Sequence, residues 1–280
     1  MEKCDLHVHS TFSDGSYTPK ELIEAAISEG ISTLALCDHN TVDGIPDFLC
    51  AAQGKPIRAI AGAEFSVDYE GEEVHLLGLG LSMHSFDRIG ARMRAADARK
   101  EESNLSMIAS LARVGILLDY EEMKRRTPKG RINRANFAAQ MIERGYVSSR
   151  EEAFARYLSP HGAHYVPPKR IDFWEMLDEL CAMGAVPVLA HPLLNFDEDA
   201  LRVLLRGASR RGLVGMECLY STYTESESAL SLSLASEYGL LPSGGSDFHG
   251  ANKPDIHIGT GRGGLCVPNA WATALMDRCQ

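Results

Sequence analysis

Short apolar runs alternate with helical segments along most of this chain, and the alternation limits the folds that it can adopt. The run at residues 33–37 is continuously apolar after Thr33, and the runs at 57–63 and 186–190 are mostly apolar, which is typical of parallel strands buried on both faces. Helical segments between such strands predict a parallel sheet with helices packed on it. At 280 residues the chain suits one α/β barrel-like domain, with or without an insertion.

The amino-terminal segment predicts a strand that carries two histidines on one face. Polar and apolar residues alternate over residues 4–9, so Asp5, His7 and His9 share a face. The Cα atoms of the two histidines are then roughly 7 Å apart, and both imidazoles reach one ion at about 2.0–2.1 Å per bond. Two surface histidines at a strand edge would show the same spacing, so residues further along the chain must decide between these interpretations.

Histidines and carboxylates also follow several of the later predicted strands. With the first pair they give the candidate metal ligands His7, His9, Asp14, His39, Glu64, His75, His191, Asp247 and His249. Imidazoles and carboxylates without cysteine suit zinc, manganese or iron, and Glu64 could bridge two ions. Clustered carboxylates repel unless cations lie between them, and the set is too large for one ion, so we expect two or three divalent ions. Asp14 by itself would be an ordinary Asp-Gly turn.

The chain organisation predicts one barrel domain interrupted by an insertion. From residue 85 the pattern is helical and rich in charge, and strands alternate with helices again only after residue 168. We therefore expect an all-helical insertion over residues 85–168, with the barrel formed by residues 1–84 and 169–280. About seven predicted strands carry polar residues at their carboxyl ends, where functional groups collect in barrels of this class.

Composition argues against several classes of protein. The net charge of −10 disfavours binding of long nucleic acid, which requires a basic surface. No stretch approaches the ~18 apolar residues of a membrane-spanning helix, and the charged start lacks a secretory signal. The cysteines are scattered without CxxC spacing, so we expect reduced thiols in a cytoplasmic protein. Residues 259–264 match GxGxxG by letter, but no helix follows, so we predict a flexible loop rather than a nucleotide site.

Several ordered motifs resemble those of the PHP (polymerase and histidinol phosphatase) family of metal-dependent phosphoesterases. They are Asp5-Leu6-His7-Val8-His9-Ser10, Asp38-His39, Gly62-Ala63-Glu64, His75, Ala190-His191-Pro192 and Gly245-Ser246-Asp247-Phe248-His249. The resemblance implies a distorted seven-stranded (β/α) barrel with a trinuclear metal site. It assigns one ion to His7, His9, Glu64 and Asp247, a second to Glu64, His75 and His191, and a third to Asp14, His39 and His249. Some family members have His where this chain has Asp14.

The insertion also resembles that of a subgroup of small-molecule phosphatases in this family. An Arg-Pro-His in that subgroup corresponds to Arg134-Ala135-Asn136 here, so the arginine is kept and the other two residues differ. A guanidinium can donate two parallel hydrogen bonds to a phosphate. We therefore expect Arg134, together with Asn136 and Lys169, to bind the substrate.

The expected function is hydrolysis of a phosphate monoester or cyclic diester of a small nucleotide or sugar, such as a nucleoside 3′,5′-bisphosphate or a cyclic phosphoribose. A metal-activated hydroxide would attack phosphorus, Asp14, His39 and His249 would supply the proton for the leaving group, and Asp5 and Asp38 would orient ligands.

Three alternatives remain at this point. A histidinol-phosphate-type phosphatase would use the same metal centre. An amidohydrolase also opens with HxH, but it would normally add a carboxylated lysine, for which there is no clear candidate. A catalytically inactive metal-binding module would have lost ligands, and the sequence shows no such loss. A nucleophilic serine is disfavoured because no GxSxG precedes a helix.

Overall fold

The computed structural model describes residues 2–127, 132–159, 162–165, 167–168 and 170–279. The chain divides into two compact units, which we call the barrel unit (Met1–Gly90 and Ile171–Gln280) and the insertion unit (Ala91–Arg170). The division falls inside the long helix α3 (Phe86–Ala112). The predicted domain limits at residues 85 and 168 remain predictions.

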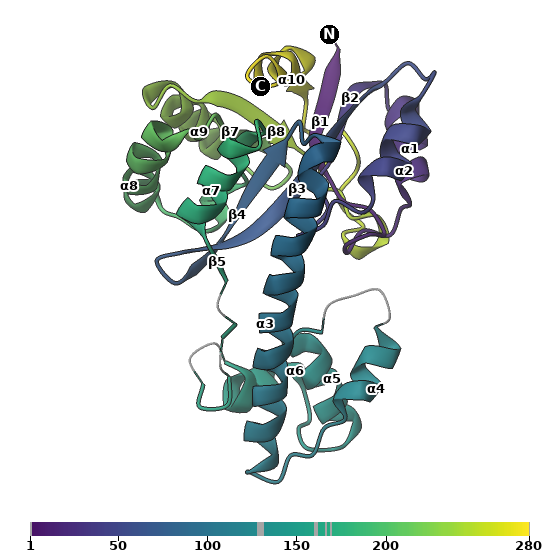
Figure 1. Ribbon diagram of the computed structural model, residues 1–280, viewed down its shortest axis with the longest axis vertical. Coiled ribbons are helices and arrows are strands. Elements are labelled where there is room, and N and C mark those ends of the chain that lie inside the picture. The colour runs from purple at the N-terminus through teal and green to yellow at the C-terminus, as the bar shows by residue number, and fades with distance from the viewer. Residues whose placement is uncertain (1, 128–131, 160–161, 166, 169, 280) are drawn as a thin grey trace. The chain divides into compact units, whose positions relative to one another are not determined.

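The barrel unit is built on one mixed sheet that is nearly closed into a barrel (Figure 1). Its strands run in the order β8-β7-β6-β4-β3-β2-β1-β9, and β5 pairs with β3. Two of them, β5 and β9, have two residues each, and the other strands of the described chain are longer. The predicted α/β barrel is thus confirmed. The strands are β1 (Lys3–Val8), β2 (Ile31–Leu36), β3 (Arg58–Tyr69), β4 (Glu72–Leu79), β5 (Ile171–Asp172), β6 (Val186–Leu189), β7 (Gly215–Tyr220), β8 (Leu241–Gly245) and β9 (Val267–Pro268).

The sheet is not parallel throughout. Strand β4 runs antiparallel to both β3 and β6. Strands β3 and β4 form a hairpin around Glu70 and Gly71, as the runs at residues 65–69 and 73–79 of the sequence predict. Strand β3 also continues past the expected end at Ala63, because it pairs with β2 over residues 58–61 and with β4 over residues 62–69. Glu64 therefore lies within a long strand rather than at the end of a short one.

Hydrogen bonds between β1 and the segment after β8 bring the two ends of the chain together. The backbone N–H of Asp247 donates to the carbonyl of His7 at 2.8 Å, and that of His9 donates to Phe248 at 2.9 Å. Gly245 permits this approach, because a Cβ there would lie 2.6 Å from the His7 nitrogen. Histidines near the amino terminus and acids near the carboxyl terminus consequently share one end of the barrel.

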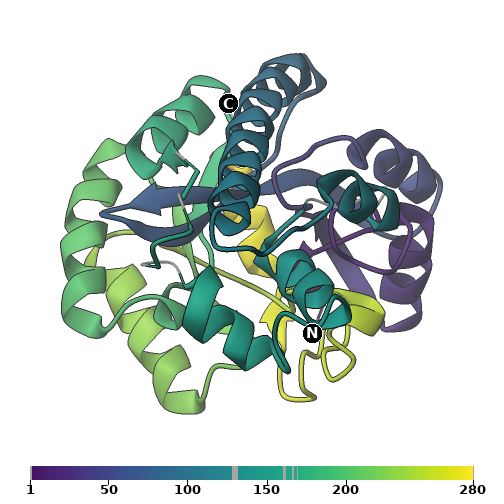
Figure 2. The ribbon, with the colours of Figure 1, turned by 90° about the horizontal axis from the view of Figure 1, so that it is seen from below.

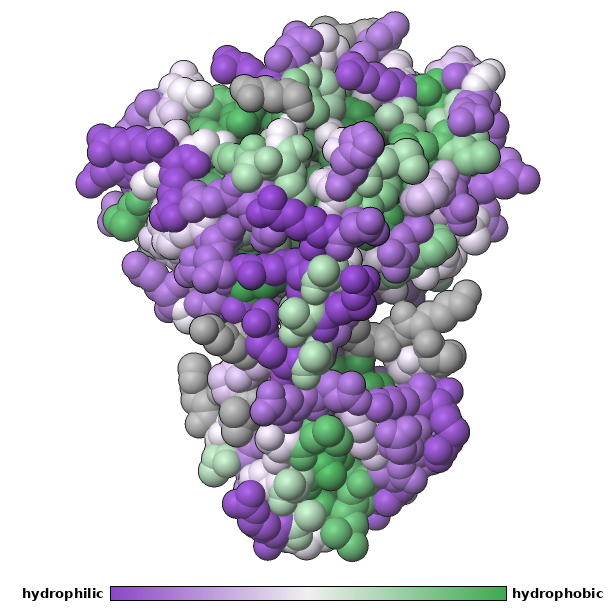
Figure 3. Space-filling view, viewed as in Figure 1, coloured by the Kyte–Doolittle hydropathy of each residue, from purple (hydrophilic) through white to green (hydrophobic). Residues whose placement is uncertain are grey.

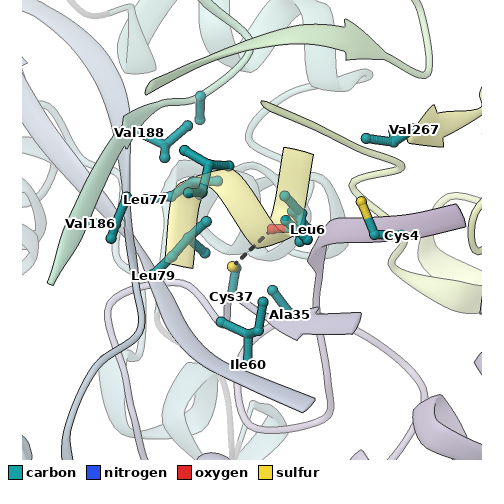
Figure 4. Close-up of a cluster of buried hydrophobic side chains, with 13 residues drawn as sticks. Cys4, Leu6, Ala35, Cys37, Ile60, Leu77, Leu79, Val186, Val188 and Val267 are labelled. Carbon is teal, nitrogen blue, oxygen red and sulfur yellow. Dashed lines mark hydrogen bonds between the residues drawn. The ribbon is translucent and has the colours of Figure 1, made fainter. Parts of the chain in front are cut away.

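Apolar side chains fill the barrel interior (Figure 4). Leu6, Leu77 and Val188 come from three different strands, and α10 (Asn269–Met276) adds Leu275 to the same cluster. The thiol of Cys37 lies among them and donates to the Leu6 carbonyl at 3.4 Å. This continuous packing provides a rigid base for the polar residues at the strand ends.

Helices pack on the outside of the barrel, with α1 and α2 on one side and α8 and α9 on the other (Figure 2). Thr18 and Glu21 form a capping box at the start of α1, as the segment Thr18-Pro19-Lys20-Glu21, with a proline at the first helical position, predicts. The helices of this unit other than α3 and α10 are α1 (Pro19–Ser28), α2 (Ile45–Ala52), α7 (Phe173–Ala182), α8 (Glu198–Ala208) and α9 (Glu225–Glu237), with short helices η1 (Met83–Ser85), η3 (Pro192–Leu194), η4 (Ser209–Arg211) and η5 (Gly250–Asn252).

The insertion unit is helical throughout its described residues. Its core contains Met107, Leu111, Phe137 and Met141, all fully buried. Besides the distal part of α3, its helices are α4 (Tyr120–Arg126), α5 (Arg134–Glu143), α6 (Arg150–Ala153) and the π-helical η2 (Phe154–Leu158). Ion pairs such as Arg126–Glu143 at 2.6 Å lie on its exposed faces, where they contribute little to stability.

Hydrophilic side chains predominate on the visible face of each unit in Figure 3. Within the described part of the chain, no helix combines the length and apolar character that crossing a bilayer requires.

The contact of Gly245 with His7 gives a test of barrel closure. Gly245→Ala should lower the free energy of unfolding by about 1–3 kcal/mol, because the new methyl group must displace the β1 backbone. Thermal and denaturant unfolding measure the effect. Gly264→Ala is the matched control, since a Cβ there has no neighbour within 4 Å. Equal stability of the two variants would contradict the close packing of β1 and β8.

Candidate metal centre

The carboxylate of Glu64 is the centre of a buried cluster of imidazoles. Its Oε1 lies 2.8 Å from His75 Nδ1 and 3.0 Å from His191 Nε2. Its Oε2 lies 2.9 Å from His39 Nδ1, and within 3.4 Å of Nε2 of both His7 and His9. Each oxygen of one carboxylate thus faces its own set of nitrogens, which is the arrangement of a bridging ligand.

A second group of donors adjoins this cluster through His9. Asp247 Oδ1 lies 3.1 Å from His9 Nε2 and 3.4 Å from His249 Nδ1. His249 Nε2 lies 3.2 Å from Asp14 Oδ1, and the Asp14 side chain is 56% exposed. The centre therefore has a buried part around Glu64 and a part open to solvent around Asp14.

The structure brings together all the residues that the sequence predicts as ligands. Three overlapping groups have donor atoms within 4.8 Å of one another: His9 with Asp14, His39 and His249; His7 with His9 and Glu64; and His39 with Glu64 and His75. Asp247 and His191 lie beside these groups, through their contacts with His9 and Glu64. The division of the ligands among particular ions remains a prediction.

Glu217 orients two of these histidines from β7. Its Oε1 lies 3.1 Å from His7 Nδ1, and its Oε2 accepts the backbone N–H of His191 at 2.7 Å. A carboxylate accepts a hydrogen bond from Nδ1–H, so the lone pair of a neutral His7 is on Nε2, which faces Glu64. This carboxylate–histidine pair is typical of metal sites in proteins.

His249 is oriented in a similar way by the backbone. Its Nδ1 lies 2.8 Å from the carbonyl oxygen of Asp247, which can only accept a hydrogen bond. The proton of a neutral His249 is therefore on Nδ1, and the lone pair of Nε2 faces Asp14.

Asp5 joins three segments beneath the ligands. Its carboxylate accepts the backbone N–H groups of His7, Ser246 and Gly259 at 3.3, 2.8 and 2.8 Å. The glycine-rich segment is thus tied to the metal-site strands at Gly259, and strand β9 follows it.

Asp38 fixes the loop that carries Asp14. It accepts from the backbone N–H and the hydroxyl of Ser10 at 2.7 and 2.6 Å, and from the hydroxyl of Ser13 at 2.7 Å. Burial raises its pKa, although these hydrogen bonds oppose the shift. The expected role of Asp38 in orienting ligands has this physical basis and stays a prediction.

Two candidate ligands, and the residue that follows His39, have left-handed backbones. Asn40, His191 and Asp247 have φ of 52°, 26° and 55°, a region that non-glycine residues rarely occupy. Such conformations persist where the surrounding structure holds them in place, and they cluster at functional sites. Here the backbone turns at the ends of strands so that His191 and Asp247 point into the centre.

The electrostatics of the cluster favour an ionised Glu64. Burial raises its pKa, but the surrounding imidazoles outweigh burial and hold the pKa well below its usual value. Burial and the neighbouring rings of His39 and His249 lower the pKa of His9 to about 3. Burial works against a charged His75, yet Glu64 and Glu73 raise the pKa of His75 to about 10.

These residues fit divalent ions. Glu64 Oε2, His7 Nε2 and both ring nitrogens of His9 are buried without a hydrogen bond of normal geometry to any described residue. The two carboxylates beside His7 raise its pKa despite burial, because they require a positive charge between them. A divalent ion supplies that charge, and it competes with protons for the same nitrogens.

The predicted substrate-binding residues belong to the insertion unit. Arg134 Nη1 donates to the Leu158 carbonyl at 3.1 Å, and the guanidinium lies 4.7 Å from the centre of the Tyr165 ring. Asn136 caps helix α5 by accepting the backbone N–H of Asn133 at 2.9 Å. Lys169 lies outside the described residues. The substrate roles of all three remain predictions.

Sequence reasoning missed three residues that contact the candidate ligands. The sequence could have indicated Glu217, because it is the one charged residue of β7 and its neighbours in that strand are uncharged. Tyr220 and Lys253 contact Oδ2 of Asp247 at 2.7 and 2.6 Å. No pattern in the sequence indicates these two contacts.

The position of Glu217 leads to a test of ligand orientation. Glu217→Gln should lower the metal affinity about 10–100-fold, because a neutral amide holds the Nδ1–H group of His7 less strongly. Competition with a chelator measures this affinity, and the metal content of the purified protein provides a second measure. Glu237→Gln, on the exposed end of α9, is the control. Wild-type affinity in the Glu217 variant would exclude the proposed orientation.

Comparison with known proteins gives relatives over nearly the whole chain. A 5′-3′ exoribonuclease from Haemophilus influenzae is 32% identical, over 89% of this chain and 90% of that protein. A phosphoribosyl 1,2-cyclic phosphate 1,2-diphosphodiesterase from Eggerthella lenta is 30% identical, over 91% of this chain and 97% of that protein. A 3′,5′-nucleoside bisphosphate phosphatase from Chromobacterium violaceum is 28% identical, over 92% and 91%.

Solved structures with a similar fold and a family model point to the same kind of protein as these relatives. The structure of a protein from Chromobacterium violaceum, titled an amidohydrolase with bound sulfate and no metal, is 27% identical with a TM-score of 0.76, and covers 99% of this chain and 96% of that chain. A candidate metal-dependent phosphoesterase from Bifidobacterium adolescentis shares the fold, with 24% identity, a TM-score of 0.77, and coverage of 100% and 97%. The PHP domain model matches residues 5–137. The chain therefore belongs to the PHP family of metal-dependent phosphoesterases.

Proposed function

We propose that this enzyme hydrolyses a phosphate ester of a small nucleotide or sugar at a cluster of two or three divalent ions. The observation that carries the proposal is the buried Glu64 carboxylate, whose two oxygens face imidazoles from different elements at 2.8–3.4 Å. Burying one carboxylate among so many imidazoles is costly unless cations occupy the space between them.

In this proposal the ligands divide among three ions as the family resemblance implies. Manganese, iron and zinc each match the nitrogen and oxygen donors. The proposed sets are His7, His9, Glu64 and Asp247; Glu64, His75 and His191; and Asp14, His39 and His249. When bound, such ions polarise phosphoryl oxygens and activate a water as the nucleophile.

Asp14, His39 and His249 are the proposed source of the proton for the leaving group. They lie at the open side of the centre, where the Asp14 side chain is 56% exposed and that of His39 is 23% exposed. His249 Nδ1 is held by the Asp247 carbonyl, so that Nε2 is the nitrogen that exchanges a proton or binds an ion. Substrate oxygens that enter from solvent would meet these residues first.

The names of the relatives support a small phosphorylated substrate. Two of them act, by name, on a nucleoside 3′,5′-bisphosphate and on a cyclic phosphoribose. The net charge of −10 disfavours a long nucleic acid as the substrate. The free thiols at all cysteines fit the reducing conditions of the cytoplasm, where we place the enzyme.

A second candidate function is removal of nucleotides from the 5′ end of RNA. It is favoured by the 32% identity with the Haemophilus influenzae exoribonuclease. The same metal centre would cleave a phosphodiester, so the two functions differ in the substrate that binds rather than in the chemistry.

A substrate panel tests the proposal. We expect phosphate release from a nucleoside 3′,5′-bisphosphate or opening of a cyclic phosphoribose, and we expect EDTA to abolish it and added manganese to restore it. The panel includes histidinol phosphate, a short 5′-phosphorylated RNA and an amide. Preferred release of nucleotides from RNA would support the second candidate. Amide turnover without phosphate release, or activity unaffected by EDTA, would contradict both.

Arg134 gives a test of the insertion unit. Arg134→Ala should lower kcat/KM for phosphorylated substrates about 10–100-fold, because a charged donor to the phosphate is lost. Metal content should not change. Arg126→Ala, at an exposed arginine of the same unit, controls for the loss of a positive charge, and thermal unfolding controls for the lost packing on Tyr165. Unchanged kinetics in the Arg134 variant would remove this residue from the substrate site.

A further inference from the structure

Lys253 places a positive charge directly beside the metal-site carboxylates. It follows η5, and its Nζ lies 2.6 Å from Asp247 Oδ2. The hydroxyl of Tyr220 donates to the same oxygen at 2.7 Å. Oδ1 of this carboxylate faces His9 and His249. The two oxygens of Asp247 therefore have separate functions: Oδ1 faces the centre, and Oδ2 holds Lys253 and Tyr220.

Lys253 retains the capacity to bind a further anion. An ammonium has three donors, and Asp247 Oδ2 accepts one of them. The Lys253 side chain is 40% exposed, whereas that of Asp247 is 7% exposed, so the lysine reaches solvent above a buried carboxylate. A substrate oxygen entering from solvent could accept one of the remaining protons.

The negative charge of the buried carboxylates explains why a cation at this position would help an anionic substrate to bind. Glu64, Glu217 and Asp247 are buried near one another, and an anionic substrate is repelled by them wherever the ions do not screen their charge. Lys253 is held at a fixed position by a charge-assisted hydrogen bond, so a phosphate that binds there need not order a mobile side chain.

We propose that Lys253 is a substrate-binding residue, which donates from Nζ to an oxygen of the phosphate bound at the metal centre while Asp247 Oδ2 holds it in place. This inference rests on the proposed function and adds to it a phosphate contact from the barrel unit, independent of the insertion unit. The class of ligand is a phosphate monoester or free inorganic phosphate.

The test measures binding of inorganic phosphate to the manganese-loaded protein by calorimetry, with the manganese content of each sample determined. Lys253→Met should raise the dissociation constant for phosphate at least about tenfold, and Lys253→Arg should restore most of the affinity. Tyr220→Phe removes the other donor to Asp247 Oδ2 but no charge, so phosphate affinity should change less than about threefold. Lys20→Met, on the exposed face of α1, controls for net charge.

Three results would overturn the inference. The first is wild-type phosphate affinity in Lys253→Met. The second is an equal loss of affinity in Lys253→Met and Tyr220→Phe, since both would then act through Asp247. The third is loss of manganese from Lys253→Met that excess metal does not restore. If the wild-type protein hydrolyses phosphate esters, each of these results removes Lys253 alone from the site; if it hydrolyses none, the proposed function itself fails.

Discussion

The need to balance one buried negative charge governs the structure of this centre. Glu64 has no exposure to solvent, and transferring a carboxylate into such a site costs several kcal/mol unless partners compensate. The chain places imidazoles from separate elements around it, and Glu217 and Asp247 lie beyond them. Together these residues form a set of nitrogen lone pairs and carboxylates that requires positive charge. Divalent ions would supply this charge, and the ligands are already in position to bind them.

The rest of the barrel unit holds this arrangement fixed. Asp5 connects β1, the segment after β8 and the glycine-rich segment through three backbone hydrogen bonds. Asp38 accepts hydrogen bonds from Ser10 and Ser13 and so holds the loop that carries Asp14 on the open side of the centre. Metal sites depend on such outer contacts nearly as much as on the ligands, because these contacts set ring orientation and basicity. The apolar interior of Figure 4 supports the strands that carry these residues or lead into the loops that carry them.

Local patterns in the sequence predicted much of the fold and most of the centre. Alternation at residues 4–9 identified His7 and His9, and the capping signal at Thr18 identified the start of α1. The continuity of β3 was missed: the sequence predicted a strand at residues 57–63 and a separate hairpin arm at residues 65–69, and local periodicity does not show that these two runs form one strand. Tyr220 and Lys253 were missed for a related reason: their contacts with Asp247 depend on how distant loops meet. The substrate roles of Arg134 and Asn136 rest on resemblance alone, since geometry within the insertion unit gives these residues local partners.

The hydrogen bonds between His7 and Asp247 also determine when the centre can form. A nascent chain on the ribosome exposes His7, His9 and Glu64 early, whereas Asp247 and His249 emerge near the end of translation. Contacts between residues so distant in sequence form slowly, since a long loop must first close. An incomplete chain therefore holds only a partial set of ligands, and the full centre arises in the same step that seats the last long strand against the first.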